Sequence, residues 1–117
     1  MRYIKGHEES SLIFSHHPPC RTGSRYMDRK YFFRKSKAFF SLVGKLKSRT
    51  VLFCGHYHNE GFLALPTLDV YLTPSTFFQL DRDSHDFKVE YTGPGWRLID
   101  WDKQIHTEVR YPVLVQT

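Results

Sequence analysis

The sequence has little cysteine and no long hydrophobic segment, and both absences limit what the chain can be. Of its 117 residues only Cys20 and Cys54 are cysteines, so it can form one disulfide at most. Nothing near them is typical of an oxidising compartment, and we therefore expect two free thiols. No apolar run approaches the roughly 18–20 residues that a membrane-spanning helix needs. Residues 1–9 hold no apolar signal-peptide core, so we expect a cytoplasmic protein that does not bind membranes.

Acidic residues are scarce in one part of the chain. The ten lysine and arginine residues from Arg21 to Arg49 face a single acid, Asp28, and much of the net charge of +5 lies there. A solvated helix face is the favoured interpretation of this basic segment, and attraction to a phosphate-bearing partner is the alternative. Because no known nucleic-acid-binding motif accompanies the segment, we do not expect nucleic acid to be the partner.

The first half of the chain is predicted to be α/β. The apolar runs Leu12–Ser15 and Thr50–Cys54 are typical of buried strands. The helix between them is predicted to begin with Asp28 as its N-cap and to run to about Lys47. Its apolar side chains recur at helical spacing and should face the core: Phe32, Phe33, Phe39, Phe40, Val43 and Leu46. A strand, a helix and a second strand form a right-handed crossover, so the two strands should pair in parallel.

The second half is predicted to be mostly β. Short apolar segments separated by proline, glycine and polar residues favour strands over residues 61–65, 69–72, 76–80, 95–101 and 106–111. The turn residues Asp102–Gln104 between the last two segments predict an antiparallel hairpin, and residues 81–87 and 93–95 are predicted to be loops. Two parallel strands with one helix would leave apolar sheet faces uncovered.

Four histidines follow the two predicted parallel strands. His16 and His17 come directly after the first strand, and His56 and His58 come just after the second. Because the loops beyond the carboxyl ends of adjacent parallel strands form one crevice, the two pairs should meet. In an extended chain His56 and His58 would point to the same side, with Tyr57 pointing away, and could reach one metal ion or two neighbouring ions.

Two other interpretations of these histidines are open. A buried histidine is most often a hydrogen-bonded core residue, although two pairs at two strand ends make this interpretation less favoured. A structural zinc site is the second alternative, with Cys20 and Cys54 joining the histidines as tetrahedral ligands. The spacing of these residues does not match the usual paired-ligand motifs, so we favour a metal site built from the histidines.

The segments around the histidines resemble those of the calcineurin-like metallophosphoesterases. The last motif of that family, Gly-His-x-His, is present as Gly55-His56-Tyr57-His58, and a preceding strand that ends in His-His-Pro is present as Leu12–Pro18. More narrowly, the chain resembles bacterial class III cyclic 3′,5′-AMP phosphodiesterases, which continue with Thr-Pro-Ser-Thr and Pro-Gly-aromatic-Arg segments. Here these are Thr73–Thr76 and Pro94–Arg97. The four segments in this order are specific, and the resemblance covers nearly the whole chain from about Leu12.

The resemblance implies a fold and a reaction. The chain would be the C-terminal half of a four-layer α/β/β/α sandwich, a βαβ crossover followed by mainly antiparallel strands. His16 and His56 would ligate one of two divalent metal ions (Mn, Fe or Zn), and His58 would ligate the other. A hydroxide activated by both ions would convert 3′,5′-cyclic AMP to 5′-AMP.

The resemblance also implies substrate contacts. His17 would act near the phosphate, as a catalytic or substrate-binding residue, although the choice between His16 and His17 as the metal ligand is open. Further contacts to the substrate, a cyclic nucleotide or another phosphodiester, would come from Asn59 and from Arg21 or Arg25.

The first three motifs of the family are missing. They precede the His-His-Pro strand, where this chain has about eleven residues, and Asp83-Ser84-His85 spells Asp-x-His only beyond the last motif. Without them neither metal ion has all its ligands. Residues 1–117 are therefore predicted to form one partial domain that hydrolyses no phosphodiester at a meaningful rate on its own. Self-association, or pairing with a chain that carries the missing motifs, would complete the site. The alternatives are a non-catalytic subunit of such a pair and, with less support, a basic nucleic-acid-binding module.

Overall fold

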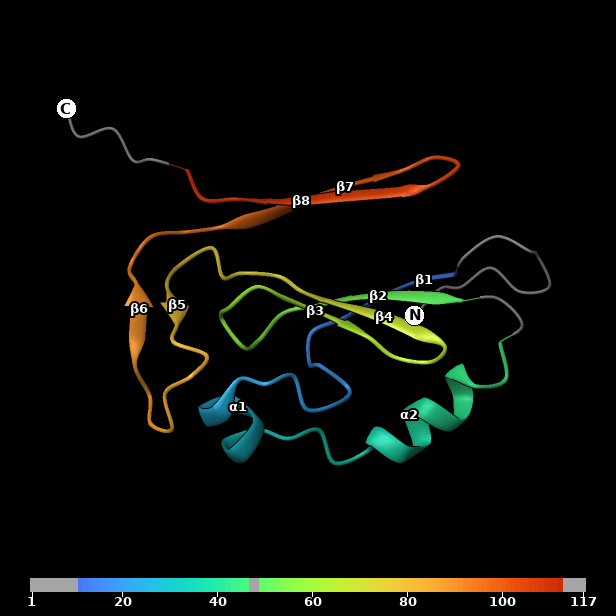
Figure 1. Cartoon of the computed structure of the whole chain (residues 1–117), viewed down its shortest axis with the longest axis horizontal. Helices are drawn as coiled ribbons and strands as arrows, with labels where there is room; N and C mark the ends of the chain where they lie inside the picture. The colour runs from blue at the N-terminus through green and yellow to red at the C-terminus, as the bar shows by residue number, and fades with distance from the viewer. Residues whose placement is uncertain (1–10, 47–48, 113–117) are drawn as a thin grey trace.

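The computed structural model describes residues 11–46 and 49–112 of the chain. These residues form short helices and strands, shown in Figure 1. The helices are α1 (Arg25–Lys30) and α2 (Ser36–Val43), and the strands are β1 (Ser11–Ser15), β2 (Thr50–Cys54), β3 (Gly61–Ala64), β4 (Leu68–Leu72), β5 (Gln79–Leu80), β6 (Val89–Tyr91), β7 (Trp96–Trp101) and β8 (Ile105–Arg110). The mixed α/β class is confirmed. Within the described part, no helix is long and apolar enough to cross a membrane.

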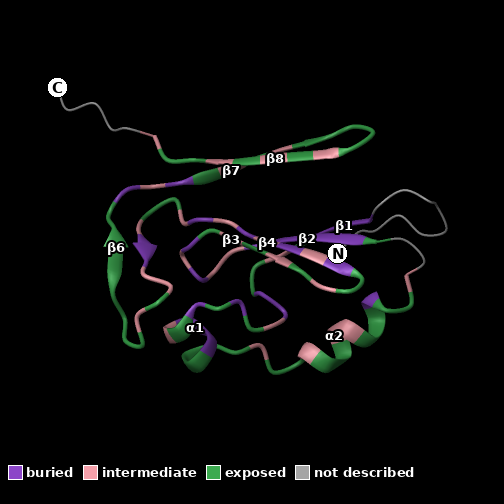
Figure 2. Cartoon of the chain, viewed as in Figure 1, coloured by how far each residue is buried: buried purple, intermediate pink, exposed green. Residues whose placement is uncertain are grey.

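A four-stranded sheet with the order β1-β2-β4-β3 forms the centre of the fold. β1 pairs in parallel with β2, with Leu12 opposite Val51, and β4 pairs in parallel with the other side of β2. β3 runs antiparallel to β4. Every residue of β2 is buried (Figure 2), because this strand has a neighbour on each side and a covering layer on each face. The predicted crossover and its parallel pairing are confirmed, so β1 and β2 end at the same edge of the sheet.

Different elements cover the two faces of the central sheet. Successive side chains of a strand point to opposite faces, so Leu52 packs in the cluster that contains Val43 of α2. Val51 faces the other side, in the cluster that Ile99 of β7 and Ile105 of β8 complete. A helix, the sheet and the β7–β8 hairpin are thus stacked as layers (Figure 1). The fourth layer implied by the family resemblance stays a prediction.

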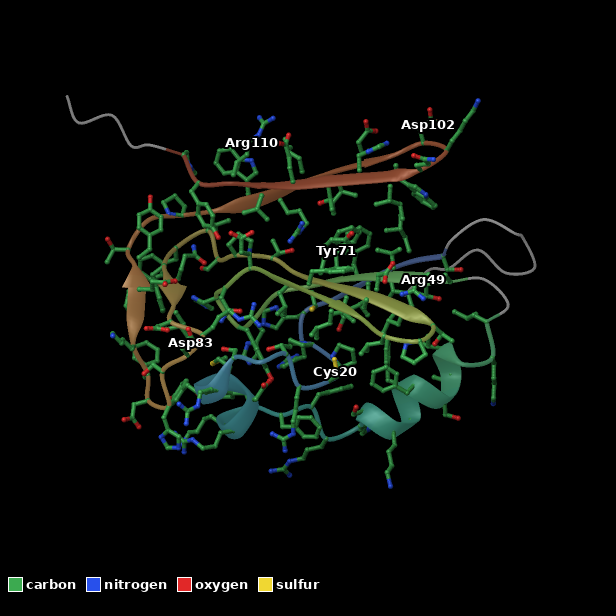
Figure 3. The ribbon with its side chains drawn as sticks, in the orientation of Figure 1. Cys20, Arg49, Tyr71, Asp83, Asp102 and Arg110 are labelled. Carbon is green, nitrogen blue, oxygen red and sulfur yellow. The ribbon has the colours of Figure 1, made fainter. Side chains whose placement is uncertain are left out.

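The predicted hairpin is confirmed, with β7 and β8 antiparallel on either side of the turn at Asp102–Gln104. Arg97 joins this hairpin to the central sheet. Its guanidinium donates hydrogen bonds to the carbonyl of Leu72 at 2.9 Å and to Thr107 Oγ1 at 3.1 Å. It also lies 5.0 Å from the ring centroid of Tyr71, which Figure 3 shows between the hairpin and the sheet. The arginine of the Pro-Gly-Trp-Arg segment therefore holds two layers together.

The single helix predicted from Asp28 to about Lys47 is wrong, because the chain forms two helices with a bend between them. Asp28 is not an N-cap and lies inside α1. Its carboxylate accepts hydrogen bonds from the backbone N–H groups of Thr22 and Gly23, each at 2.9 Å. This carboxylate therefore orders the loop before the helix instead of the helix itself. Lys47, the predicted end, lies outside the described residues.

The bend between α1 and α2 uses aromatic side chains that the helix prediction assigned to the core. Phe33 stacks on His17 with ring centroids 6.5 Å apart. Phe32 is 38% exposed, and the guanidinium of Arg21 lies 4.7 Å from its ring centroid. Val43 of α2 is buried as predicted. The apolar stripe is therefore a core face only in α2, and before it the aromatic rings support the loop after β1.

The strands of the second half differ from the prediction mainly in length. The strand predicted over residues 76–80 shortens to β5, because Gln79 folds back and bonds the backbone N–H and carbonyl of Ser75. β6 was not predicted from the sequence, and it pairs antiparallel with β5.

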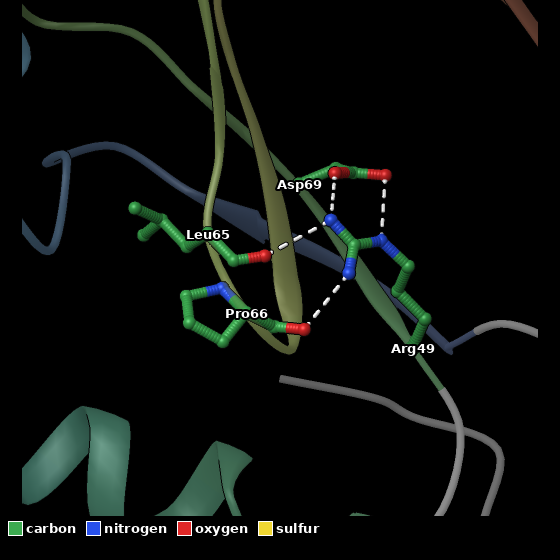
Figure 4. Close-up of polar contacts among 4 residues, drawn as sticks. All are labelled: Arg49, Leu65, Pro66 and Asp69. Carbon is green, nitrogen blue, oxygen red and sulfur yellow. Dashed lines mark hydrogen bonds and ion pairs between the residues drawn. The ribbon is translucent and has the colours of Figure 1, made fainter.

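Arg49 shows that part of the basic segment has structural tasks. Its guanidinium pairs with the carboxylate of Asp69 and donates to the carbonyls of Leu65 and Pro66 at 3.0 and 2.9 Å (Figure 4). These bonds fasten the β3–β4 connection to the start of β2. A solvated helix face is therefore an incomplete description of the basic segment.

Candidate metal centre

The histidine loops after β1 and β2 meet, as the parallel pairing predicts. The N–H of Gly55 donates to the carbonyl of His16 at 3.0 Å, which continues the pairing beyond the strand ends. The ring centroid of His56 lies 4.9 Å from that of His16 and 4.4 Å from that of His17. One ring nitrogen from each of these histidines lies within 4.8 Å of one from each of the others. We call these three residues the histidine cluster.

His56 is the most enclosed member of the histidine cluster. Its Nε2 is buried and has no hydrogen-bond partner among the described residues. Burial lowers the pKa of His56, and the nearby His17, His16 and His58 lower it further. A neutral imidazole with a free lone pair is the form that binds a metal ion. The donor set and the unsatisfied nitrogen therefore fit a divalent cation such as Mn²⁺, Fe²⁺ or Zn²⁺.

His58 lies next to the histidine cluster but is not part of it. Its Nδ1 lies 2.9 Å from the carbonyl oxygen of Phe78, and its ring contacts the ring of Phe78 at 4.5 Å. Since a carbonyl oxygen only accepts, this contact favours the neutral tautomer with the proton on Nδ1 and the lone pair on Nε2. His58 is thus oriented in the way that metal-binding histidines usually are.

The extended conformation predicted for the Gly-His-x-His segment is wrong. His56 and His58 have φ angles of +68° and +55°, so the chain turns at both residues instead of running straight. Tyr57 points away from the site, as expected, and packs with Met27 and Leu80 in a buried cluster. The two histidines are therefore separated by a turn around a buried tyrosine, which explains why only one of them joins the histidine cluster.

The left-handed backbone at His58 has a measurable consequence for stability. We expect His58→Gly to be more stable than His58→Ala by about 1 kcal/mol, since only glycine adopts this conformation without strain. Both variants lose the same imidazole, so urea unfolding isolates the backbone effect. His17, which has no positive φ, is the control: there the alanine variant should be the more stable of the two. The same order of stability at both positions would contradict the expectation.

Asn59 was predicted to contact the substrate, and the structure places it inside the protein at 5% exposure. Its amide nitrogen donates to Ser24 Oγ at 3.0 Å and to the carbonyl of Tyr57 at 3.1 Å. The amide therefore ties the loop after β2 to the residue before α1. Its Oδ1 is buried without a partner in the described part of the chain, so an acceptor stays free.

The two candidate arginines for substrate binding make contacts of their own. Arg21 is stacked over Phe32, as described above, and Arg25 Nη1 donates to the carbonyl of Asp83 at 3.3 Å. Both side chains start from elements next to the loop of His16 and His17. Neither belongs to the histidine cluster, and their role toward a substrate stays a prediction.

Arg82 is a residue of the site that sequence reasoning missed. It lies in a predicted loop, and its Nη2 donates to the carbonyl of Thr22 at 2.7 Å while Nη1 donates to that of Glu60 at 3.3 Å. The first carbonyl lies in the loop after β1 and the second in the loop after β2. A Cβ on Gly23 or Gly61 would lie 2.9 Å from a guanidinium nitrogen, so both glycines make room for Arg82. These two glycines are the only signal in the sequence for such a contact.

The cysteines do not support the structural zinc alternative. Both thiols are free, as predicted, and no cysteine joins the metal-ligand group found in the described residues. Burial raises the pKa of Cys54 to about 12, which keeps this thiol protonated and a poor metal ligand. Burial also raises the pKa of Cys20. The arrangement therefore favours the histidines as ligands.

Comparisons with known proteins identify curated relatives of the chain. No family model matches the chain. It is 39% identical over 90 residues to a probable cyclic nucleotide phosphodiesterase of Fibrobacter succinogenes, and the alignment covers 77% of this chain and 35% of that protein. It is 32% identical over 90 residues to the 3′,5′-cyclic adenosine monophosphate phosphodiesterase CpdA of Vibrio vulnificus, covering 77% of this chain and 32% of that protein. CpdA of Escherichia coli K12 is 29% identical over 104 residues, or 87% of this chain and 38% of that protein.

These relatives give the class of the chain. The chain is a relative of proteins named as cyclic nucleotide phosphodiesterases, and the resemblance seen in its motifs is confirmed over 77–87% of its length. The chain spans about a third of the length of the curated relatives that it matches.

Proposed function

We propose that the chain provides one half of a metal-dependent phosphodiesterase site that converts 3′,5′-cyclic AMP to 5′-AMP. The observation that carries this proposal is the meeting of His16, His17 and His56, whose buried Nε2 lacks a hydrogen-bond partner in the described residues. Two of the relatives above are named as 3′,5′-cyclic AMP phosphodiesterases, which supports the choice of substrate.

The residues of the site divide into metal ligands and substrate contacts. His56 and His16 would hold one of two divalent ions, and His58 would hold the second through its free Nε2. His17 would face the phosphate, with Arg21 as a further candidate contact, while the buried Asn59 would support the loop after β2. When bound, the ions supply a hydroxide nucleophile at neutral pH and neutralise charge on the phosphoryl group. The protein residues hold the phosphodiester in position and orient the ligands through their hydrogen bonds.

We also propose that the histidines form only one part of the site. The ligand group found there contains imidazole nitrogens and no carboxylate, whereas two neighbouring divalent ions need bridging oxygen ligands to hold them together. We therefore propose that a partner chain carrying the rest of the domain supplies the missing ligands; self-association is the alternative, and turnover by the purified chain would indicate it. The isolated chain should bind metal and show no meaningful turnover.

A complementation assay tests the proposed function. The purified chain with Mn²⁺ is expected to leave cyclic AMP intact. Addition of the part of the Fibrobacter relative outside the aligned segment should restore Mn²⁺-dependent formation of 5′-AMP, and His58→Ala should abolish it. Turnover by the isolated chain that disappears in His58→Ala would contradict the incomplete site. The absence of Mn²⁺ binding and of complementation would contradict the proposed function itself.

A further inference from the structure

A row of aromatic rings runs along the surface from His56 to His58. Tyr31 contacts His56, with ring centroids 5.4 Å apart, and Tyr26 contacts Tyr31 at 6.4 Å. Phe87 contacts Tyr26 at 5.7 Å, and Phe78 contacts Phe87 at 6.2 Å. Phe78 in turn contacts His58 at 4.5 Å. We call Tyr26, Tyr31, Phe78 and Phe87 the aromatic arc, because they begin and end at histidines of the candidate site.

The aromatic arc combines a fixed base with an exposed rim. Tyr26 and Phe78 pack against the buried cluster that contains Tyr57, so their rings are held in place. Tyr31 and Phe87 are 45% and 56% exposed. Exposed aromatic rings that form a continuous patch mark a binding surface more often than rings scattered singly. Here the patch borders the ring nitrogens proposed to bind metal and phosphate.

Two arginines of the basic segment hold the aromatic arc together. Arg25 donates to the carbonyl of Asp83, which Figure 3 shows beside α1, and Arg29 donates to the carbonyl of His85, each at 3.3 Å. The loop that carries Phe87 is therefore tied to the helix that carries Tyr26. The guanidinium of Arg29 also lies 5.7 Å from the ring centroid of Tyr26. Positive charge and aromatic faces thus occur side by side, which suits a ligand that has both a phosphate and a π-system.

We propose that the aromatic arc binds the heterocyclic base of a nucleotide whose phosphate lies at the histidine cluster. This inference rests on the proposed function and adds the surface that distinguishes a nucleotide from a simple phosphodiester. Stacking between a base and an aromatic ring is strong for every base, so the aromatic arc selects for nucleotides as a class. The contacts within the aromatic arc are T-shaped, and the exposure of Tyr31 and Phe87 makes them the positions at which a base would stack.

Binding of 5′-AMP and of ribose 5-phosphate to the Mn²⁺-saturated chain separates the base from the phosphate. We expect 5′-AMP to bind about tenfold more tightly than ribose 5-phosphate, as measured by calorimetry. Tyr31→Leu and Phe87→Leu should each remove most of this advantage and leave the affinity for ribose 5-phosphate unchanged. Phe62→Leu, a phenylalanine of β3 that is 53% exposed, is the matched control and should change neither affinity.

The outcomes separate this inference from the proposed function. Equal affinities for both ligands, or an advantage of 5′-AMP that survives in Phe87→Leu, would overturn the role of the aromatic arc and leave the metal and phosphate site standing. An advantage of 5′-AMP that is lost in Phe87→Leu but does not depend on Mn²⁺ would support the aromatic arc and speak against the metal site. Binding of neither ligand would overturn both. An independent readout of stacking is the change in the NMR chemical shifts of Tyr31 and Phe87 that the ring current of the adenine base would cause when 5′-AMP is added.

Discussion

The variant His56→Ala is expected to lower the affinity of the chain for Mn²⁺ by about 100-fold or more, since loss of an outer-shell partner alone typically costs 10–100-fold. His56 lies next to both His16 and His17 in the cluster, and its Nε2 is the buried nitrogen without a partner in the described residues. Its removal leaves two exposed imidazoles with nothing to hold them around an ion. Isothermal titration calorimetry measures the change directly.

The thermal stability of the same variant provides a second measurement. Mn²⁺ at 100 times its dissociation constant should stabilise the wild-type chain by about 2.7 kcal/mol, and this gain should fall to about 0.4 kcal/mol or less in His56→Ala. Without metal we expect the free energies of unfolding of the wild-type chain and His56→Ala to differ by less than about 1 kcal/mol. The packing lost with the ring is offset by removal of an unsatisfied buried nitrogen. The metal-free comparison therefore separates loss of binding from loss of fold.

An exposed histidine outside the site provides the control for His56→Ala. His106 lies on β8 in the hairpin and is exposed, so His106→Ala should bind Mn²⁺ like the wild-type chain. Equal loss of affinity in both variants would mean that the ion binds histidines at random. Unchanged affinity in His56→Ala would exclude the histidine cluster as the metal centre.

The central part of the fold could be predicted from the sequence because it follows from local patterns. Apart from Thr50 the run Thr50–Cys54 is apolar, which is typical of a strand buried on both faces, and its bounds agree with β2. The parallel pairing with β1 follows from the handedness of crossover connections. The start of α1 could not be predicted, because Asp28 lies inside the helix and its carboxylate binds backbone N–H groups of the preceding loop. From the sequence alone, an aspartate just before an apolar helical pattern is equally suited to be the N-cap of the helix.

Of the candidate site, the meeting of the histidines could be predicted from the sequence, and their backbone conformation could not. Two pairs of histidines after two parallel strands were expected to meet, and His16 and His56 do. The positive φ at His58 was not predicted, because the turn depends on burial of Tyr57 between the two histidines. The contacts of Arg82 were not predicted either, since bonds from a side chain to distant carbonyls leave no periodic pattern. Sequence patterns thus identified the candidate residues, and tertiary contacts decide how they are oriented.

Arg82→Ala is expected to lower both the stability of the chain and its metal affinity. The guanidinium donates to the carbonyls of Thr22 and Glu60, and a hydrogen bond from a charged group contributes about 1.5–3 kcal/mol when it is not exposed. Because one of these bonds is exposed, we expect a loss of about 2–3 kcal/mol in the free energy of unfolding. The two carbonyls lie in the two loops that carry the histidines, so metal affinity should fall by about tenfold as these loops lose their mutual position.

The conservative variant separates positioning of the histidines from general stability. Arg82→Lys keeps the charge, but one ammonium group replaces a planar fork that reaches two carbonyls at once. We expect it to recover part of the stability and little of the metal affinity, as followed by the intensity of the visible spectrum with Co²⁺ in place of Mn²⁺. Arg110→Ala, which removes an exposed arginine paired only with Glu108, should change neither quantity measurably. If Arg82→Lys restores metal affinity and stability in equal proportion, Arg82 contributes to stability alone and does not position the histidine loops.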